Sequence, residues 1–142
     1  NKMRDKHVAH IFQCDSDHNL IRLKDFQFRL QYVNSGKPGH LSIDVGFPLG
    51  DKEIRWTPKA PKYDMQTNRY YLNFAGEYHH EPIKSKRNIV LQNLKGNPTF
   101  IVRKVKQHVY EIECLPIVDP LIVFTIGLSD IIGPSPYYDY IG

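Results

Sequence analysis

The feature that most constrains the fold is an uncharged, strongly apolar segment near the C-terminus, Leu121–Ser129. Asp119-Pro120 before it is a typical N-cap with a first-turn proline, and Gly133-Pro134 after it is a typical stop. These signals predict a helix over about residues 120–132, although the abundance of Ile and Val would also suit a strand. About thirteen residues span only roughly 20 Å, which is too short to cross a bilayer. Because a helix that is apolar on all sides needs burial elsewhere, we expect it to be the most buried element of the protein.

Most of the remaining chain alternates apolar and polar residues with a period of two, which is typical of half-buried strands. Strands are predicted over residues 20–32, 41–45, 69–74, 87–94, 99–105 and 108–115, the last two as a hairpin. Its core candidates are Phe100, Val102, Val109, Tyr110 and Ile112. Breaks are predicted at residues 34–39, 46–50 and 59–62. One buried helix among many strands favours a mainly β (α+β) fold, an antiparallel β-barrel wrapped around a central hydrophobic C-terminal helix.

Length and composition limit the class of protein. The 142 residues favour a single domain over 1–142, with residues 133–142 as a tail. A hydrophobic content of 41% argues against wholesale disorder. The absence of any apolar run of about 18 residues predicts no transmembrane segment. Two cysteines cannot form a disulfide scaffold, so we expect reduced thiols, and the N-terminus carries no visible signal peptide.

Charge is unevenly distributed along the chain. No acidic residue occurs between Pro82 and Tyr110, and no basic residue follows Glu111. The basic block comprises Lys84, Lys86, Arg87, Lys95, Arg103, Lys104 and Lys106. Such a block favours an anionic partner such as a phosphoinositide or another acidic lipid, while a solvated strand face is the plainer alternative. Nucleic acid is disfavoured because the net charge is only +4.

Patterns for catalysis or metal binding are weak. His7, His10, Cys14 and His18 would share a face only on a helix, and this segment suits a strand equally well. Cys114 and the pair Glu111 and Glu113 lie in a predicted hairpin strand, where a buried thiol and a wet strand edge are the simpler interpretations. The chain has no nucleophile elbow and no phosphate-cradling glycine loop. We therefore predict a non-enzyme without metal or cofactor.

Three segments in order, followed by the helix, resemble the tubby-like C-terminal domain family, a β-barrel wrapped around a hydrophobic C-terminal helix. Residues 57–64 look like its "NKTPVWND"-type segment, and residues 73–78 look like its "NFHGRV" signature with Asn73, Phe74 and Gly76 kept. Ile83-Lys84 resembles the Val-Lys of "ASVKNF", and residues 100–129 match without a gap. Compared with the family, the chain is divergent and lacks much of the N-terminal part of the domain. The acidic "KLACE"-type end is also replaced.

The resemblance implies a lipid-binding role, because the family binds bisphosphorylated phosphoinositides through basic side chains. The family's "GPRKM"-type loop reads Lys37-Pro38-Gly39-His40-Leu41 here and has lost its arginine. Lys37 and His40 are the candidates to take over its contact with the headgroup. Arg22 and Lys24 are candidates because residues two apart on a strand share a face. The full set of headgroup candidates is Arg22, Lys24, Lys37, His40, Lys84, Lys86 and Lys106. The expected structural core includes Phe74, Gly76, Phe124 and Leu128.

By this resemblance the chain is expected to be a membrane-tethering or adaptor module, cytoplasmic and peripheral to membranes, with a role in the cilium, in membrane trafficking or in the nucleus. Two alternatives stay open. A degenerate tubby-like barrel could act as a structural or protein-interaction subunit without lipid binding. A helix-filled barrel of the phospholipid-scramblase type shares the same plan, but that family normally continues its helix into a membrane-proximal segment.

Overall fold

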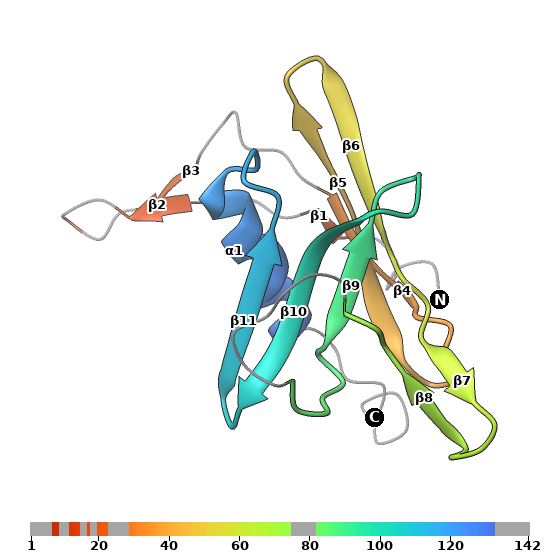
Figure 1. Cartoon of the computed structure of the whole chain (residues 1–142). Coiled ribbons are helices and arrows are strands. Elements are labelled where there is room, and N and C mark those ends of the chain that lie inside the picture. The colour runs from red at the N-terminus through yellow and green to blue at the C-terminus, as the bar shows by residue number, and fades with distance from the viewer. Residues whose placement is uncertain are drawn as a thin grey trace.

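A computed structural model of the chain describes residues 7–8, 12–14, 17, 20–22, 29–74 and 82–132. They form strands and one helix (Figure 1). The elements are β1 (His7–Val8), β2 (Phe12–Cys14), β3 (Leu20–Arg22), β4 (Arg29–Asn34), β5 (Leu41–Leu49), β6 (Lys52–Pro58), β7 (Lys62–Asp64), β8 (Arg69–Tyr71), β9 (Ile89–Gln92), β10 (Pro98–Lys106), β11 (Val109–Cys114) and α1 (Pro120–Ile131). The expectation of a mainly β chain with one C-terminal helix is confirmed.

Seven of the described strands form one sheet in the order β1-β4-β5-β6-β9-β10-β11, and all their pairings are antiparallel. Two small hairpins, β2–β3 and β7–β8, lie outside it. The helix contacts both β11 and β5, which are separated in the sheet by β6, β9 and β10. A single helix can contact both strands only if the sheet curves around it, as Figure 1 shows.

The core lies between this curved sheet and the helix. Trp56 of β6 is only 2% exposed, and its ring packs edge-on against Phe47 and stacks on Phe100, with centroids 5.0 and 6.1 Å away. Ile126 is the fully buried helix residue in this cluster. Gly127 lets the helix approach β11 closely, because a β-carbon there would collide with the side chain of Ile112.

The start of the helix follows the predicted chemistry. The Asp119 side chain accepts a hydrogen bond of 2.8 Å from the Leu121 backbone N–H, and Pro120 occupies the first turn. The hairpin prediction also holds, since β10 and β11 pair antiparallel, and two of its core candidates, Phe100 and Val102, are buried. Val109 is more exposed than expected, at 37%.

The prediction that the helix is the most buried element is wrong. Phe124 is 60% exposed and Leu128 41% exposed, so neither belongs to the buried core. Only Ile126, Gly127 and Asp130 are buried on α1. The described strands cover one side of the helix, and its apolar residues on the other side remain open to solvent.

Two further expectations concern the predicted break at residues 46–50 and the core residues Phe74 and Gly76. The predicted break at residues 46–50 is wrong, because β5 continues to Leu49 and pairs with β6 beyond Gly46. Pro48 is tolerated there because β4 pairs with β5 only as far as Gly46, which leaves an edge that needs no N–H donor. Phe74 is half-buried and lines a cleft, whereas Gly76 lies outside the described residues.

Candidate anion-binding cleft

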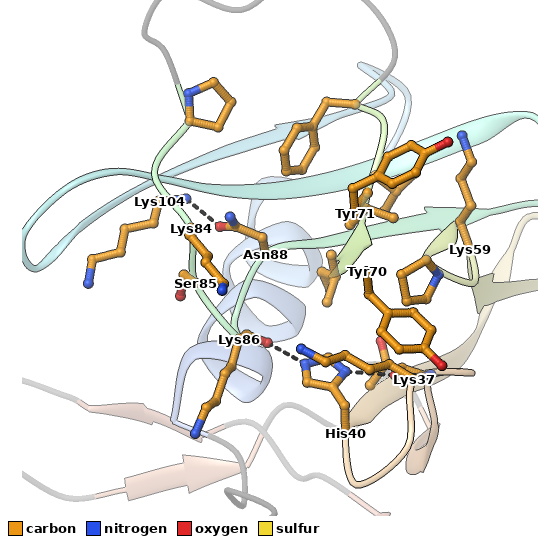
Figure 2. Close-up of a pocket in the computed structure, with 18 of the residues that line it drawn as sticks. Lys37, His40, Lys59, Tyr70, Tyr71, Lys84, Ser85, Lys86, Asn88 and Lys104 are labelled. Carbon is orange, nitrogen blue, oxygen red and sulfur yellow. Dashed lines mark hydrogen bonds between the residues drawn. The ribbon is translucent and has the colours of Figure 1, made fainter. Parts of the chain in front are cut away.

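A cleft of about 620 Å³ opens beside the curved sheet. Its walls come from Ser35–Ser42, Lys59–Pro61, Arg69–Phe74, Pro82–Val90 and Lys104. Turns and short connecting segments supply most of this lining, while β9 and β10 supply its base. Figure 2 shows that the labelled residues come from these separate parts of the chain, and that the ends of Lys59, Lys86 and Lys104 point in different directions. We call this space the cationic cleft.

The described residues that line the cleft carry charge of one sign. No aspartate or glutamate is among the described residues that line it. The basic side chains in the lining are Lys37, His40, Lys59, Arg69, Lys84, Lys86 and Lys104. Cations that surround a concave surface focus a positive potential and raise the local concentration of anions. The cleft is therefore suited to an anionic ligand.

One part of the wall is aromatic. Tyr70 packs against Tyr63 of β7 with ring centroids 5.0 Å apart, which holds the β7–β8 hairpin together. The Lys37 ammonium lies 6.0 Å from the centroid of the Tyr70 ring, within range of a cation–π interaction. Tyr71 is 45% exposed beside it. Ring faces next to ammonium groups suit a ligand that combines a ring with phosphates.

His40 links the two sides of the cleft. Its Nε2 lies 2.8 Å from the backbone oxygen of Lys86, and its Nδ1 lies 2.7 Å from Ser35 Oγ. A carbonyl only accepts, so Nε2 must carry the proton, and the neutral Nδ1 accepts from the Ser35 hydroxyl. Burial lowers the pKa of His40, which the Lys86 carbonyl partly offsets and the charges of Lys37, Arg87 and Lys86 lower further.

Asn88 clamps the loop that carries Lys84 and Lys86. Its Nδ2 donates to the Ile83 carbonyl at 2.8 Å, and its Oδ1 accepts from the Lys104 backbone N–H at 2.7 Å. An isolated bridge between Ile83 and Lys104 lies beside these bonds. The loop is therefore fastened to β10 by one amide side chain, as the dashed line in Figure 2 indicates.

The far end of the same loop is tied to the helix. Arg87 donates from Nη1 to the Asp130 backbone oxygen at 3.3 Å, and the Tyr32 hydroxyl donates to the Ser129 oxygen at 3.0 Å. The Asp130 carboxyl is buried, and this burial raises its pKa well above the usual range, against a smaller lowering by Arg87. The last turn of α1 is thereby connected to one wall of the cleft.

The structure brings together four of the seven predicted headgroup residues: Lys37, His40, Lys84 and Lys86 all line the cleft. Lys106 is exposed at the end of β10 and does not line it. Arg22 lies in β3, where only its backbone is described, and Lys24 lies outside the described residues. The positions of these two side chains relative to the cleft are therefore not part of the described structure.

Sequence reasoning missed three lining cations, Lys59, Arg69 and Lys104, as headgroup candidates. Lys104 follows Arg103 on a strand, so the two face opposite sides. Arg103 is 2% exposed and donates from Nη2 to Glu113 at 2.8 Å. The alternation along β10 was a usable signal for Lys104. Arg69 stands beside Tyr70 and Tyr71 in the sequence, a pattern of basic and aromatic residues that suits an anionic ligand with a ring. Lys59 had no such signal, because it approaches the cleft only through the fold.

The groups considered for other chemistry lie elsewhere. Burial raises the pKa of the Cys114 thiol to about 11, so this thiol stays protonated at neutral pH. Glu113 is partly exposed and paired with Arg103. No group of three potential ligands for a metal occurs among the described residues, and His10 and His18 of the weak histidine pattern lie outside them.

Comparison of the chain with protein-family models, with curated proteins and with solved structures finds no match. Within the part of the chain that the structure describes, α1 is too short to be a membrane span and no other helix qualifies.

Proposed function

We propose that the protein is a non-enzymatic membrane-tethering or adaptor module whose cationic cleft binds the phosphorylated headgroup of a phosphoinositide. The observation that carries the proposal is the cleft itself, in which six lysine and arginine side chains and one histidine meet without a carboxylate among the described lining residues. Phosphate groups are the natural partners of such a set of donors.

The sequence resemblance and the cleft support each other. The loop that resembles the family's basic loop supplies Lys37 and His40, and the acid-free segment supplies Lys84 and Lys86. These two sets were selected on different grounds, yet a hydrogen bond joins them across 46 residues. We also propose that the curved sheet belongs to a tubby-like barrel around α1. The support for this is the contact of one helix with both β5 and β11.

Vesicle sedimentation tests the proposal. Vesicles of phosphatidylcholine with phosphatidylserine and of phosphatidylcholine with a bisphosphorylated phosphoinositide are compared at equal total negative charge, and vesicles of phosphatidylcholine alone are the uncharged control. We expect the protein to pellet most with the phosphoinositide. Raising salt from 0.1 M to 1 M should weaken binding, because the Debye length falls from about 10 Å to about 3 Å.

A matched pair of variants separates the cleft from general charge. The double variant Lys84→Glu/Lys86→Glu changes two cleft lysines. The control Lys95→Glu/Lys106→Glu makes the same charge change on exposed residues of the same basic block that do not line the cleft. Each basic residue near an anionic bilayer contributes about 1 kcal/mol, so we expect at least about a 30-fold loss for the cleft variant. Equal losses for both variants would refute the cleft as the site.

A second candidate function rests on a different observation. The apolar face of α1 is open, with Phe124 60% and Leu128 41% exposed. Exposed apolar patches commonly mark interaction surfaces. A degenerate tubby-like module that binds another protein through α1, without lipid binding, would suit this face. Failure of all vesicles to bind at low salt would favour this second candidate.

A further inference from the structure

Ser85 lies on the wall of the cationic cleft, on the loop between Lys84 and Lys86 (Figure 2). It begins a tight turn in which the Asn88 N–H donates to the Ser85 carbonyl at 3.2 Å. The side chain is half-buried and its Oγ accepts from the Arg87 backbone N–H at 3.1 Å. The hydroxyl therefore sits among the cations at the edge of the cleft.

The sequence around Ser85 is a substrate pattern for a particular class of enzyme. Basic residues stand immediately before it and at the next two positions after it, namely Lys84, Lys86 and Arg87. Kinases that select basic substrates hold such side chains with carboxylates, and an acidic residue nearby would weaken that contact. The nearest acid before Ser85 is Glu81, four residues away, and the nearest after it is Glu111, so the downstream flank offers no repulsion.

We propose that Ser85 is a phosphoacceptor for a serine kinase that selects basic substrates, and that its phosphate closes the cationic cleft to other anions. The inference rests on the proposed function of the cleft and adds its regulation. In the reaction, Ser85 Oγ attacks the γ-phosphorus of ATP supplied with the kinase. The bond from that phosphorus to the ADP oxygen breaks, and the hydroxyl proton passes to the catalytic aspartate of the kinase.

The consequence follows from charge. A phosphoserine carries about −1.5 to −2 charges at neutral pH and presents three acceptor oxygens. On the cleft wall these oxygens can pair with the neighbouring Lys84 and Lys86, and Lys37 from the opposite loop lines the same cleft. Two lysine charges are then neutralised within the cleft. Each contributes roughly fivefold to binding at an anionic surface, so vesicle binding should fall about 30-fold.

The experiment uses the full chain and a basophilic serine kinase with ATP and Mg²⁺. Mass spectrometry after proteolysis locates the phosphate, with Ser85→Ala as the negative control. Sedimentation with phosphoinositide vesicles compares phosphorylated and mock-treated protein. Ser85→Glu is compared with Leu94→Glu, which adds the same charge at a residue that is 81% exposed and does not line the cleft.

A readout without lipid keeps this inference separable from the proposed function. The second pKa of a free phosphoserine is about 6, and cations that contact the phosphate lower it. Titration followed by phosphorus NMR compares the phosphorylated protein with a phosphopeptide of residues 82–88. The peptide contains the neighbouring lysines but not Lys37, which lines the same cleft, so we expect a lower pKa in the protein.

The supporting results are phosphate on Ser85, reduced vesicle binding and a lower phosphate pKa in the protein than in the peptide. The inference is overturned if the kinase modifies the peptide but not the folded protein. It is also overturned if phosphorylated protein binds vesicles as well as mock-treated protein does, or if the two pKa values agree. If mock-treated protein binds no vesicle, the proposed function fails, and the phosphate pKa alone decides whether the phosphate occupies the cleft.

Discussion

Replacing Phe124 with Ala tests how far the helix is covered in solution. A fully buried aromatic ring removes roughly 200 Å² from water, and Phe124 is 60% exposed, so it buries about 80 Å². At about 25 cal/mol per Å² this is worth about 2 kcal/mol at most. Alanine retains part of that burial and is a better helix former. We therefore expect Phe124→Ala to lower the free energy of unfolding by about 1 kcal/mol.

The matched comparison is Ile126→Ala on the same helix. Ile126 is fully buried in the core, and truncating such a side chain costs about 2–5 kcal/mol. Urea unfolding can be followed by the fluorescence of Trp56, the single tryptophan, which is 2% exposed in that core. Leu94→Ala, at a side chain that is 81% exposed, should change stability little.

The result that would refute this reasoning is a loss of 3 kcal/mol or more for Phe124→Ala, equal to that for Ile126→Ala. The open face of α1 would then be covered in solution, as the barrel wrapped around a helix requires. Repeating the measurement at several protein concentrations would identify the cover. A loss that shrinks on dilution indicates a second copy of the chain, and a constant loss indicates a segment of the same chain.

Three further predictions concern the cleft and the last turn of α1, which is tied to it. Asn88→Ala should lower the free energy of unfolding, measured in urea, by about 1–3 kcal/mol. The reason is that it removes two hydrogen bonds and leaves the Ile83 carbonyl and the Lys104 N–H without the amide. A loss below about 0.5 kcal/mol would contradict the role of Asn88 in fastening the loop. The pKa of His40 is lowered in the folded protein, so the unfolded chain binds the proton more readily. Stability should therefore fall as pH drops below the ordinary histidine pKa near 6.5. His40→Gln should reduce the dependence of the melting temperature on pH in this range, and an unchanged dependence would argue against this role of His40. The pKa of Asp130 is raised in the folded protein, so its effect on stability has the opposite pH dependence, and stability is lost as pH rises above about 4. Asp130→Asn should therefore raise the melting temperature at pH 7 but hardly at pH 4. Equal gains at both pH values would contradict the raised pKa of Asp130.

Local chemistry explains which parts of the fold could be predicted. The start of the helix follows from an N-cap and a first-turn proline, and both are properties of adjacent residues. The β10–β11 hairpin follows from alternation along two neighbouring strands. The exposure of Phe124 could not be predicted, because it depends on how many strands cover the helix. That number is a property of topology, and the hydropathy of the segment does not contain it.

The cleft, too, depends on topology and could be predicted from the sequence only in part. The loop with Lys37 and His40 and the loop with Lys84 and Lys86 were each suspected from sequence, but nothing local required them to meet. Their meeting depends on the pairing of β6 with β9. This pairing places the start of β9, and the loop before it, at the same end of the sheet as the loop between β4 and β5. β6 was itself not predicted, although it contains the buried Trp56.

The contrast between the cleft and the rest of the described surface is the strongest physical argument for a ligand. Away from the cleft, three of the described arginines face carboxylates: Arg29 pairs with Glu53, Arg55 with Asp44, and Arg103 with Glu113. In the cleft, seven basic side chains gather with no carboxylate in the described lining. Like charges that share a concave surface repel one another and destabilise the free protein. If a phosphorylated headgroup binds there as we propose, its charge would relieve that repulsion, and the cations that destabilise the free protein would contribute to binding.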